Sequence, residues 1–320
     1  MTDLPEVINT RAPAMAWCRH ENDDDYVYWS ASERAIGPDV RWPAPQPLRD
    51  RRTSNTPSIS GAGPGACMAW KGSGGDTRIW YSLWDTTTDT WGPQIPSRFE
   101  TENFPTLVRY REHTLMFWNN ARRGDDGLGR IVWSELVNGE WVNPLGGPSG
   151  TSKAVLGIRT DGVAATWNTH EDALYIAWRG PGTNTDVSWW ELDDHTPDGS
   201  YLWQESGTVP HAQASAPPTL VSDGNAMYLA WRNAQDDHIS WSMSVTGNWF
   251  EPRVLTDRRT SAGPTLGVVN TSDLVMVWKG AGADPVMWWS RFQNGWFGEP
   301  GPQQAFPDRK MYADLRASLS

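Results

Sequence analysis

Tryptophan recurs along this chain in three columns whose members are about 50 residues apart. The first column, which ends an apolar segment, consists of Trp17, Trp70, Trp118, Trp178, Trp231 and Trp278. The second column consists of Trp29, Tyr81, Trp133, Trp189, Trp241 and Trp289, and Ser follows five of its six members. The third column consists of Trp42, Trp91, Trp141, Trp203, Trp249 and Trp296. Because the columns contain 17 of the 22 tryptophans, the chain is an array of six similar units.

Each unit reads as four short strands of alternating character, joined by turns rich in Gly, Asp and Asn. The first strand lies about 13 residues before the first-column tryptophan, as in residues 56–59 and 104–107. No stretch shows helical periodicity. Four strands in about 50 residues, six times over, predict an all-β, six-bladed β-propeller with four antiparallel strands per blade. Large aromatic side chains suit the wedges between blades, because each buries about 150–250 Å².

We expect a single propeller domain over residues 1–320, whose ring is closed by the chain termini. The expected blades cover residues 1–49 plus 311–320, 50–98, 99–150, 151–211, 212–256 and 257–310. The triplet Asp308-Arg309-Lys310 aligns with Asp257-Arg258-Arg259 and with Asp50-Arg51-Arg52. The tail 315–319 therefore falls where the next innermost strand belongs, and we favour it over residues 5–7 as the closing strand.

The charge and the termini restrict the partners of the protein. A formal net charge of −11 and a pI of about 5.0 argue against nucleic acid and anionic membranes, which require a basic surface. The N-terminal residues form no signal peptide, and no apolar run approaches 18 residues, so we expect a cytoplasmic protein. The two cysteines, Cys18 and Cys67, are not expected to form a disulfide.

No motif indicates a metal or a cofactor. The acidic run 21–25 lacks the spaced ligands and the Gly of a calcium loop, and the six histidines lack the paired spacing of a zinc site. The sequence contains no Gly-rich phosphate loop and no nucleophile elbow. Catalytic residues therefore cannot be assigned, and we expect neither metal nor cofactor.

Charged and aromatic residues gather in the loops between blades and in those between the second and third strands, which share one face of a propeller. The candidate ligand-binding residues are Arg51, Arg52, Lys71, Asp76, Trp80, Arg179, Trp190, Arg232, Asp236, Arg258, Arg259, Lys279, Trp288 and Arg309. Guanidinium groups bind hydroxyls and carboxylates with several directed donors, and indole rings stack on the apolar faces of sugars or terpenoid-like carbons. The alternative interpretation is a solvated rim whose Lys/Arg–Asp pairs tie neighbouring loops together, each contributing little stability.

The repeats resemble those of known propeller families. Residues 69–72 with 79–82, and 277–280 with 288–290, resemble the Trp-rich repeats of Aleuria-type fucose-binding lectins. Ser134 with Gly139-Glu140-Trp141, and Ser242 with Gly247-Asn248-Trp249, resemble the Ser-x-Asp-x-Gly-x-x-Trp hairpin of the sialidase superfamily. Leu136 and Ser244 replace the Asp of that hairpin. The second resemblance therefore implies shared hairpin geometry rather than sialidase catalysis.

Three functions are compatible with this sequence. The interpretation we favour is a carbohydrate-binding lectin that recognises glycans through Arg, Asp and Trp, with Arg179 and Arg232 essential for binding. The alternative is an enzyme: a cyclase or hetero-Diels–Alderase acting on a terpenoid or polyketide in the central mouth, or a glycosidase relative. Unequal loops at 122–127 and 194–199 favour such a single shaped site. A protein-interaction scaffold rests on fold analogy alone. The ligand would be a sugar or a small molecule, and an oligomer is compatible with the sequence.

Overall fold

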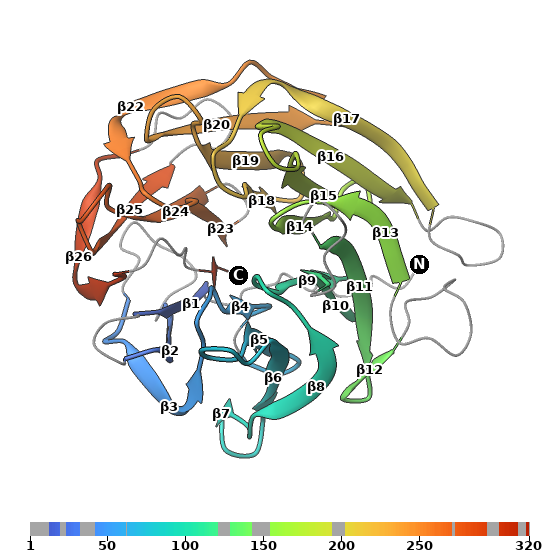
Figure 1. The fold of residues 1–320 in the computed structure, drawn as a ribbon, viewed down its shortest axis with the longest axis vertical. Coiled ribbons are helices and arrows are strands. Elements are labelled where there is room, and N and C mark those ends of the chain that lie inside the picture. The colour runs from blue at the N-terminus through green and yellow to red at the C-terminus, as the bar shows by residue number, and fades with distance from the viewer. Residues whose placement is uncertain are drawn as a thin grey trace, which may run out of the picture.

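The computed structural model describes residues 13–19, 24–32, 42–61, 63–120, 129–142, 154–193, 202–270, 273–292, 301–312 and 318–319. These residues form six small antiparallel sheets around a central axis, which makes the protein a six-bladed β-propeller (Figure 1). The described part of the chain contains no helix. The predicted fold class is confirmed. The unequal loops at 122–127 and 194–199 and the start of the acidic run 21–25 lie outside the described residues.

Each blade is a sheet of consecutive strands, with the first strand nearest the axis and the last at the periphery (Figure 1). Blade 1 contains β27 (Ser318–Leu319), β1 (Ala14–Cys18), β2 (Tyr26–Ala31) and β3 (Gln46–Arg52). Blade 2 contains β4 (Ser58–Ile59), β5 (Cys67–Lys71), β6 (Arg78–Asp85), β7 (Thr90–Trp91) and β8 (Ile95–Glu100). Blade 3 contains β9 (Thr106–Tyr110), β10 (His113–Asn119), β11 (Arg130–Val137), β12 (Glu140–Val142) and β13 (Ala154–Arg159).

The second half of the ring repeats this arrangement. Blade 4 contains β14 (Val163–Asn168), β15 (Ala173–Arg179), β16 (Asp186–Asp193) and β17 (Leu202–Gln213). Blade 5 contains β18 (Thr219–Ser222), β19 (Met227–Arg232), β20 (His238–Val245), β21 (Asn248–Trp249) and β22 (Arg253–Arg259). Blade 6 contains β23 (Thr265–Asn270), β24 (Asp273–Lys279), β25 (Val286–Phe292) and β26 (Gln304–Lys310).

The C-terminal tail closes the ring, as the alignment of the repeats predicts. β27 pairs with β1, with Leu319 opposite Met15 and Ser318 opposite Ala16. Leu319 also packs against β23 of blade 6, where a side chain on Gly267 would place its Cβ 2.9 Å from the Leu319 Cβ. Residues 5–7, the competing candidate, lie outside the described part of the chain. Blade 1 therefore combines strands from both ends of the sequence.

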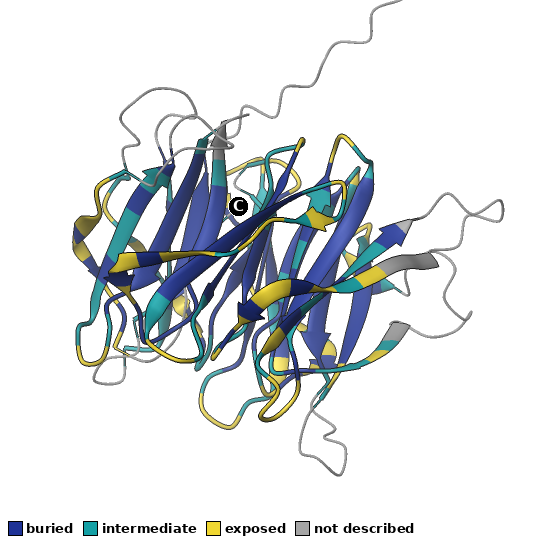
Figure 2. Cartoon of the chain, turned by 90° about the horizontal axis from the view of Figure 1, so that it is seen from above, coloured by how far each residue is buried: buried dark blue, intermediate teal, exposed yellow. Residues whose placement is uncertain are grey.

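The hydrophobic core lies between the blades rather than within any one of them (Figure 2). One cluster, for example, joins Tyr81 of blade 2 to Trp118 and Val132 of blade 3. All six first-column tryptophans are buried, with at most 7% of their surface exposed. The column therefore marks the positions at which each blade packs on its neighbour.

A hydrogen bond explains why Ser follows the second-column aromatic residue in five blades. Its hydroxyl donates to a backbone carbonyl of the outer turn in every case. The pairs are Ser30–Pro43 (3.0 Å), Ser82–Gly92 (2.9 Å), Ser134–Val142 (2.7 Å), Ser242–Phe250 (2.6 Å) and Ser290–Gly301 (2.7 Å). In blades 3 and 5 the turn itself is tight, because Asn138-Gly139 and Thr246-Gly247 both adopt positive φ angles. Both segments therefore form tight hairpins between the third strand and the outer turn.

Two further features concern the chain as a whole. Cys18 and Cys67 are buried thiols in different sheets. Burial in apolar surroundings raises the pKa of the Cys67 thiol far above its usual range. Among the described residues, no helix has the length and apolar character needed to cross a membrane.

Replacing Leu319 by Asp tests the closure. The substitution places a charge in the half-buried contact between β27, β1 and β23, so the free energy of unfolding should fall by about 1–3 kcal/mol. Denaturation in urea measures the change. Val137→Asp at an exposed strand end is the control, and its effect should stay within about 0.5 kcal/mol. Equal stability of Leu319→Asp and the wild type would show that β27 does not hold the ring.

Candidate binding site

Three of the candidate binding arginines are buried between blades. Arg51, Arg258 and Arg309 are only 2–3% exposed. Each belongs to the outermost strand of one blade and places its guanidinium over the first-column tryptophan of the next blade. The distances from Cζ to the ring centroid are 5.8 Å for Arg51 over Trp70, 5.7 Å for Arg258 over Trp278 and 5.5 Å for Arg309 over Trp17. These contacts are cation–π interactions across the blade interface.

The same guanidinium groups bind the acceptors of the outer turn. Arg309 donates to Ser30 Oγ (3.1 Å) and to the Pro43 carbonyl (2.6 Å). Arg51 donates in the same way to Ser82 Oγ (3.3 Å) and to the Gly92 carbonyl. Burial lowers the pKa of both groups. We infer that these arginines, and Arg258 with them, hold neighbouring blades together.

The two candidate lysines tie their own turn to the loop that precedes their blade. Lys71 donates to Ser54 Oγ (2.9 Å) and to the Gly72 carbonyl (3.3 Å), and burial lowers its pKa. Lys279 donates to Ser261 Oγ (2.5 Å) and to the Gly282 carbonyl (3.0 Å). Both lysines are at most 5% exposed, so their ammonium groups point into the protein.

The candidate aromatic residues Trp80 and Trp288 are half-buried and bonded to an aspartate of the preceding turn. Trp80 Nε1 donates to Asp76 (2.9 Å), and Trp288 Nε1 donates to Asp284 (3.0 Å). Arg78 also binds Asp76, and this interaction lowers the pKa of that carboxyl to about 2. Trp190 instead packs edge-on against Trp178, at 5.6 Å between ring centroids.

The remaining candidates lie at the rim and hold local loops. Arg179 donates to Asp161 (2.6 Å) and to the Gly182 carbonyl (2.5 Å), whereas Arg52 pairs with Asp25 (3.3 Å). Arg232 binds Asp237 and the Ser261 carbonyl (3.1 Å). Asp236 pairs with His238 (3.0 Å), which in turn accepts from Arg259 (3.2 Å). The candidates are thus distributed around the ring in small groups, such as Asp76 with Trp80 on blade 2 and Asp236 with Arg259, through His238, on blade 5.

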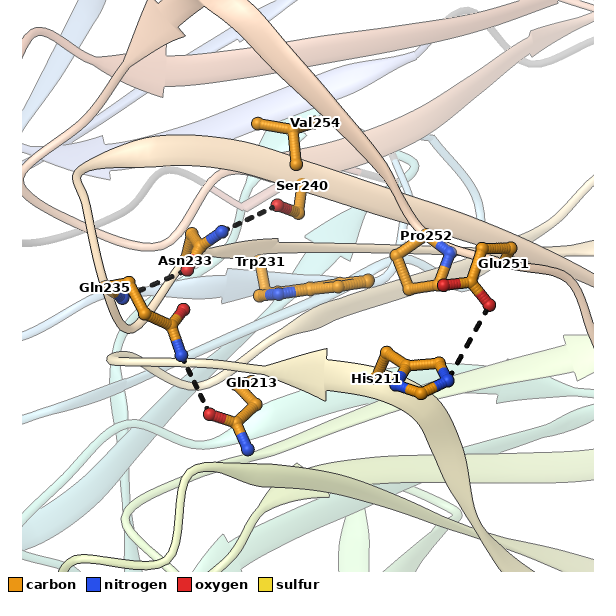
Figure 3. A pocket seen from close by; sticks show the side chains of 9 residues that line it. All are labelled: His211, Gln213, Trp231, Asn233, Gln235, Ser240, Glu251, Pro252 and Val254. Atoms are coloured by element: carbon orange, nitrogen blue, oxygen red, sulfur yellow. Dashed lines mark hydrogen bonds and ion pairs between the residues drawn. The ribbon is translucent and has the colours of Figure 1, made fainter.

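A pocket of about 300 Å³ opens between blades 4 and 5 (Figure 3). It is lined by His211, Gln213, Trp231, Asn233, Gln235, Ser240, Glu251, Pro252 and Val254. Two polar bridges flank Trp231 and join the blades: Gln235 donates to Gln213 (2.8 Å), and His211 lies 4.0 Å from Glu251. Asn233 Nδ2 reaches Ser240 Oγ at 3.5 Å. The lining contains no Lys or Arg.

Two small residues create this space. On the outermost strand of each blade, one residue pairs with the first residue of the third strand, and the residue just before it points to the next blade. In blades 1 to 6 this residue is, in order, Arg51, Phe99, Ile158, Ala212, Arg258 and Arg309. It meets the first-column tryptophan of the next blade and, beside it, the cross-strand partner of that tryptophan. In blades 2, 3, 4, 5, 6 and 1, which follow the blades just given, these partners are Trp80, Val132, Ser188, Ser240, Trp288 and Tyr28. Only the interface between blades 4 and 5 combines two small residues, Ala212 and Ser240.

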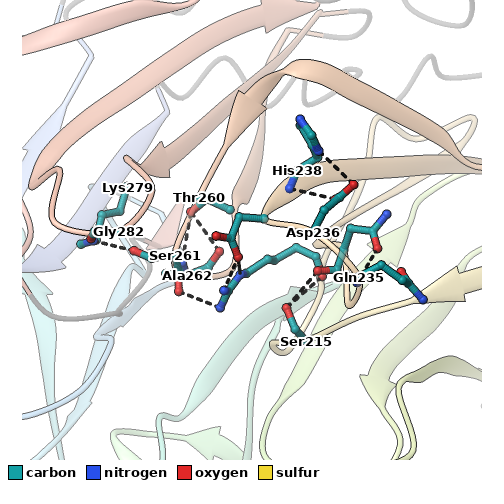
Figure 4. A network of polar contacts seen from close by, with 12 residues as sticks. Ser215, Gln235, Asp236, His238, Thr260, Ser261, Ala262, Lys279 and Gly282 are labelled. Carbon is teal, nitrogen blue, oxygen red and sulfur yellow. Dashed lines mark hydrogen bonds and ion pairs between the residues drawn. The ribbon is translucent and has the colours of Figure 1, made fainter.

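A polar network borders the pocket on the side of blade 6 (Figure 4). Ser215, after blade 4, donates to the Asn233 carbonyl of blade 5 (3.2 Å). Ser261, before blade 6, accepts from Lys279 (2.5 Å), and its carbonyl accepts from Arg232 (3.1 Å). The loops of three consecutive blades are thereby fixed next to the pocket.

Sequence reasoning missed the lining residues, although a signal was present. The triplet Asp-Arg-Arg or Asp-Arg-Lys ends blades 1, 5 and 6, whereas blade 4 ends with His211-Ala212-Gln213. The missing arginine marks the pocket, and the flanking His and Gln line it.

Comparison with known proteins adds support for the fold. No protein-family model matches the sequence, and no curated protein matches it. A protein from Bacteroides uniformis, provisionally described as a 6-phosphogluconolactonase, has a similar structure with a TM-score of 0.52 and 11% identity over 93% of this chain and 83% of its own. A likeness at this identity concerns the fold alone.

Two glycoside-processing proteins resemble the chain more distantly. The Hadza microbial sialidase Hz136 has a TM-score of 0.47 and 9% identity over 79% of this chain. The xylan β-1,4-xylosidase from Bacillus halodurans has a TM-score of 0.45 and 12% identity over 80% of this chain. The matched parts are 57% of the sialidase and 58% of the xylosidase, so this chain corresponds to little more than half of each.

The packing role of the buried arginines is testable with Arg309→Ala. The variant removes the donor to Ser30 Oγ, one of the two donors to the Pro43 carbonyl and the cation over the Trp17 ring, so it should lose about 1–3 kcal/mol of unfolding free energy. Lys310→Ala, at the adjacent exposed position, should stay within about 0.5 kcal/mol. Chemical denaturation of both variants measures the difference. An Arg309→Ala protein as stable as the wild type would rule out the packing role.

The depressed pKa of Asp76 gives a pH-dependent contribution to stability. The folded-state pKa of about 2 lies below the ordinary value of 3.8, so this contribution is present above about pH 4 and is lost as the pH falls towards 2. Asp76→Asn should therefore flatten the stability profile in this window, as followed by thermal unfolding between pH 2 and 5. Asp89→Asn, at an exposed turn, is the control. An unchanged profile for Asp76→Asn would contradict the assignment.

Proposed function

We propose that the protein is a carbohydrate-binding protein of lectin type, which holds one saccharide in the pocket between blades 4 and 5. The observation that carries this proposal is the lining of the pocket. Three carboxamides, one hydroxyl and one carboxylate, from Gln213, Asn233, Gln235, Ser240 and Glu251, surround Trp231.

This set of groups matches the chemistry of a sugar. Each hydroxyl of a sugar both donates and accepts hydrogen bonds, and a carboxamide offers both functions from one planar group. Pro252 and Val254 supply an apolar side for the C–H face of a sugar ring, and Val254 is 46% exposed. A volume of about 300 Å³ suits a monosaccharide or the terminal residue of a glycan.

The position of the pocket favours a binding protein over an enzyme in the central mouth. Its lining comes from the second, third and fourth strands of the blades and their turns, and none of the nine residues belongs to an innermost strand. Asp236 follows the lining residue Gln235 in the same loop, and we place it at the outer edge of the pocket, where it would contact the next sugar of a glycan. Arg232 binds the Ser261 carbonyl on the side of blade 6, away from the pocket.

The absence of Lys and Arg from the lining bears on the choice of sugar. Hydrogen bonds from a cationic side chain to a carboxylate are stronger than those from neutral donors, and the pocket has neither Lys nor Arg but a carboxylate of its own at Glu251. The proposal therefore excludes acidic sugars from this site.

Calorimetric titration against a monosaccharide panel tests the proposal. We expect one site per chain and recovery of the sugar unchanged. Gln235→Ala removes one bridging carboxamide and should weaken binding by about fivefold or more, which corresponds to about 1 kcal/mol. Asn248→Ala, an exposed carboxamide of the same blade, should bind like the wild type. Absence of saccharide binding, or conversion of the sugar to a product, would contradict the proposal.

A further inference from the structure

The acceptor pair that receives an arginine at other interfaces is also present in blade 5. At the interfaces ahead of blades 1 and 2, a guanidinium binds a Ser hydroxyl and the carbonyl to which that hydroxyl donates. In blade 5 the equivalent groups are Ser242 Oγ and the Phe250 carbonyl, which are joined by the same hydrogen bond at 2.6 Å. The first-column indole is retained as Trp231. Only the arginine is missing, because blade 4 has Ala212 in its place.

The surroundings of this place favour a positive charge. Glu251 stands at one end of the pocket, and Gln213 donates to Asp186 (3.3 Å) at the other. Carboxamide and hydroxyl oxygens supply further acceptors, and none of the lining residues is Lys or Arg. Glu251 and Asp186 therefore supply negative charge at the two ends of the pocket, His211 lies 4.0 Å from Glu251, and the whole chain has a net charge of −11.

We propose that the pocket is a cation subsite, in which a protonated amine or guanidinium of the ligand occupies the place of the missing arginine. This proposal rests on the proposed function for the saccharide part of the ligand, and it narrows the substrate class to basic sugars with a protonated amino group. The indole of Trp231 and the carboxylate of Glu251 would interact with the cation, while the three carboxamides bind the ring hydroxyls.

The comparison between interfaces also explains why one chain has one such site. Phe99 stacks on Trp118 with 4.5 Å between centroids, so the interface ahead of blade 3 is filled by an aromatic ring. Ile158 takes the corresponding position ahead of blade 4 and packs in the core cluster that contains Trp178. The interfaces ahead of blades 1, 2 and 6 already hold an arginine of the protein itself.

A matched series of ligands distinguishes the contribution of the ligand's positive charge to binding from that of its sugar ring. Calorimetric titration of the full chain uses glucosamine, N-acetylglucosamine, glucose and ethylguanidinium. Glucosamine should bind at least about tenfold more tightly than the other two sugars, because acetylation removes the charge but keeps the ring. Raising the pH until the amine is deprotonated should abolish this advantage. Glu251, His211 and Asp186 are the ionisable groups at the pocket, and ethylguanidinium, which stays charged, controls for any change in them: it should bind weakly at both pH values.

The outcomes of this series distinguish the two proposals. Equal binding of glucosamine and glucose would overturn the cation subsite and leave the lectin function standing. Binding of ethylguanidinium without any sugar would overturn the lectin function and leave the cation subsite standing. Binding of none of the four compounds would overturn both.

Two variants locate the site. Ala212→Arg restores the arginine found in blades 1, 5 and 6, so it should reduce glucosamine binding at least about tenfold and preserve or raise the unfolding temperature. Glu251→Gln removes the carboxylate without adding bulk, so it should weaken glucosamine binding by about threefold to tenfold. This variant tests the location of the site if Ala212→Arg does not fold. Glu100→Gln, an exposed position on β8, is the control for net charge. Wild-type glucosamine affinity in Glu251→Gln, or in a folded Ala212→Arg, would overturn the proposed location.

Discussion

The first-column tryptophan of each blade packs against the outermost strand of the blade before it, and the ring depends on this contact. A single β-sheet cannot bury both of its faces, so each blade must obtain most of its core from its neighbours. The indole supplies most of the buried apolar surface, and the residue that contacts it determines how completely the space between the two blades is filled. Arg309, Arg51 and Arg258 fill that position with a guanidinium that also binds the outer turn of the next blade, whereas Phe99 fills it with a ring.

The candidate site lies where this contact lacks a large side chain on the outermost strand. Ala212 meets Trp231, and Ser240 stands where four of the other five blades have a larger side chain opposite the equivalent tryptophan. The interface between blades 4 and 5 therefore retains its indole but gains an opening. The polar side chains of Gln213 and Glu251 line this opening, whereas at three other interfaces an arginine of the protein lies over the equivalent tryptophan. Under the proposed function, ligand binding and blade packing would use one structural position, which is either filled by the chain or left for a ligand.

The sequence predicts the fold well because the features that define it are periodic. The tryptophan columns give the number of blades, and the repeated triplet ending in Lys310 identifies the closing tail. Function is harder to predict, because the periodic position of an arginine in the sequence does not show whether its side chain is exposed or buried. Arg51 and Arg309 are of a residue type common in ligand sites, and the sequence therefore suggests binding. In the structure they are buried, because the irregular pairing at each position turns the side chain towards the next blade. The site at Ala212 is harder to find because its only signal in the sequence is an arginine missing from the end of blade 4, and strand register is what confirms that Ala212 stands in its place.

A crystal structure of the protein grown with glucosamine would test the central claim most directly. The account predicts electron density for one sugar between blades 4 and 5, with its amino group beside Trp231 and Glu251 and no ligand over Trp17, Trp70 or Trp278. Density for the sugar in the central channel, or at an interface that already holds a buried arginine, would contradict it.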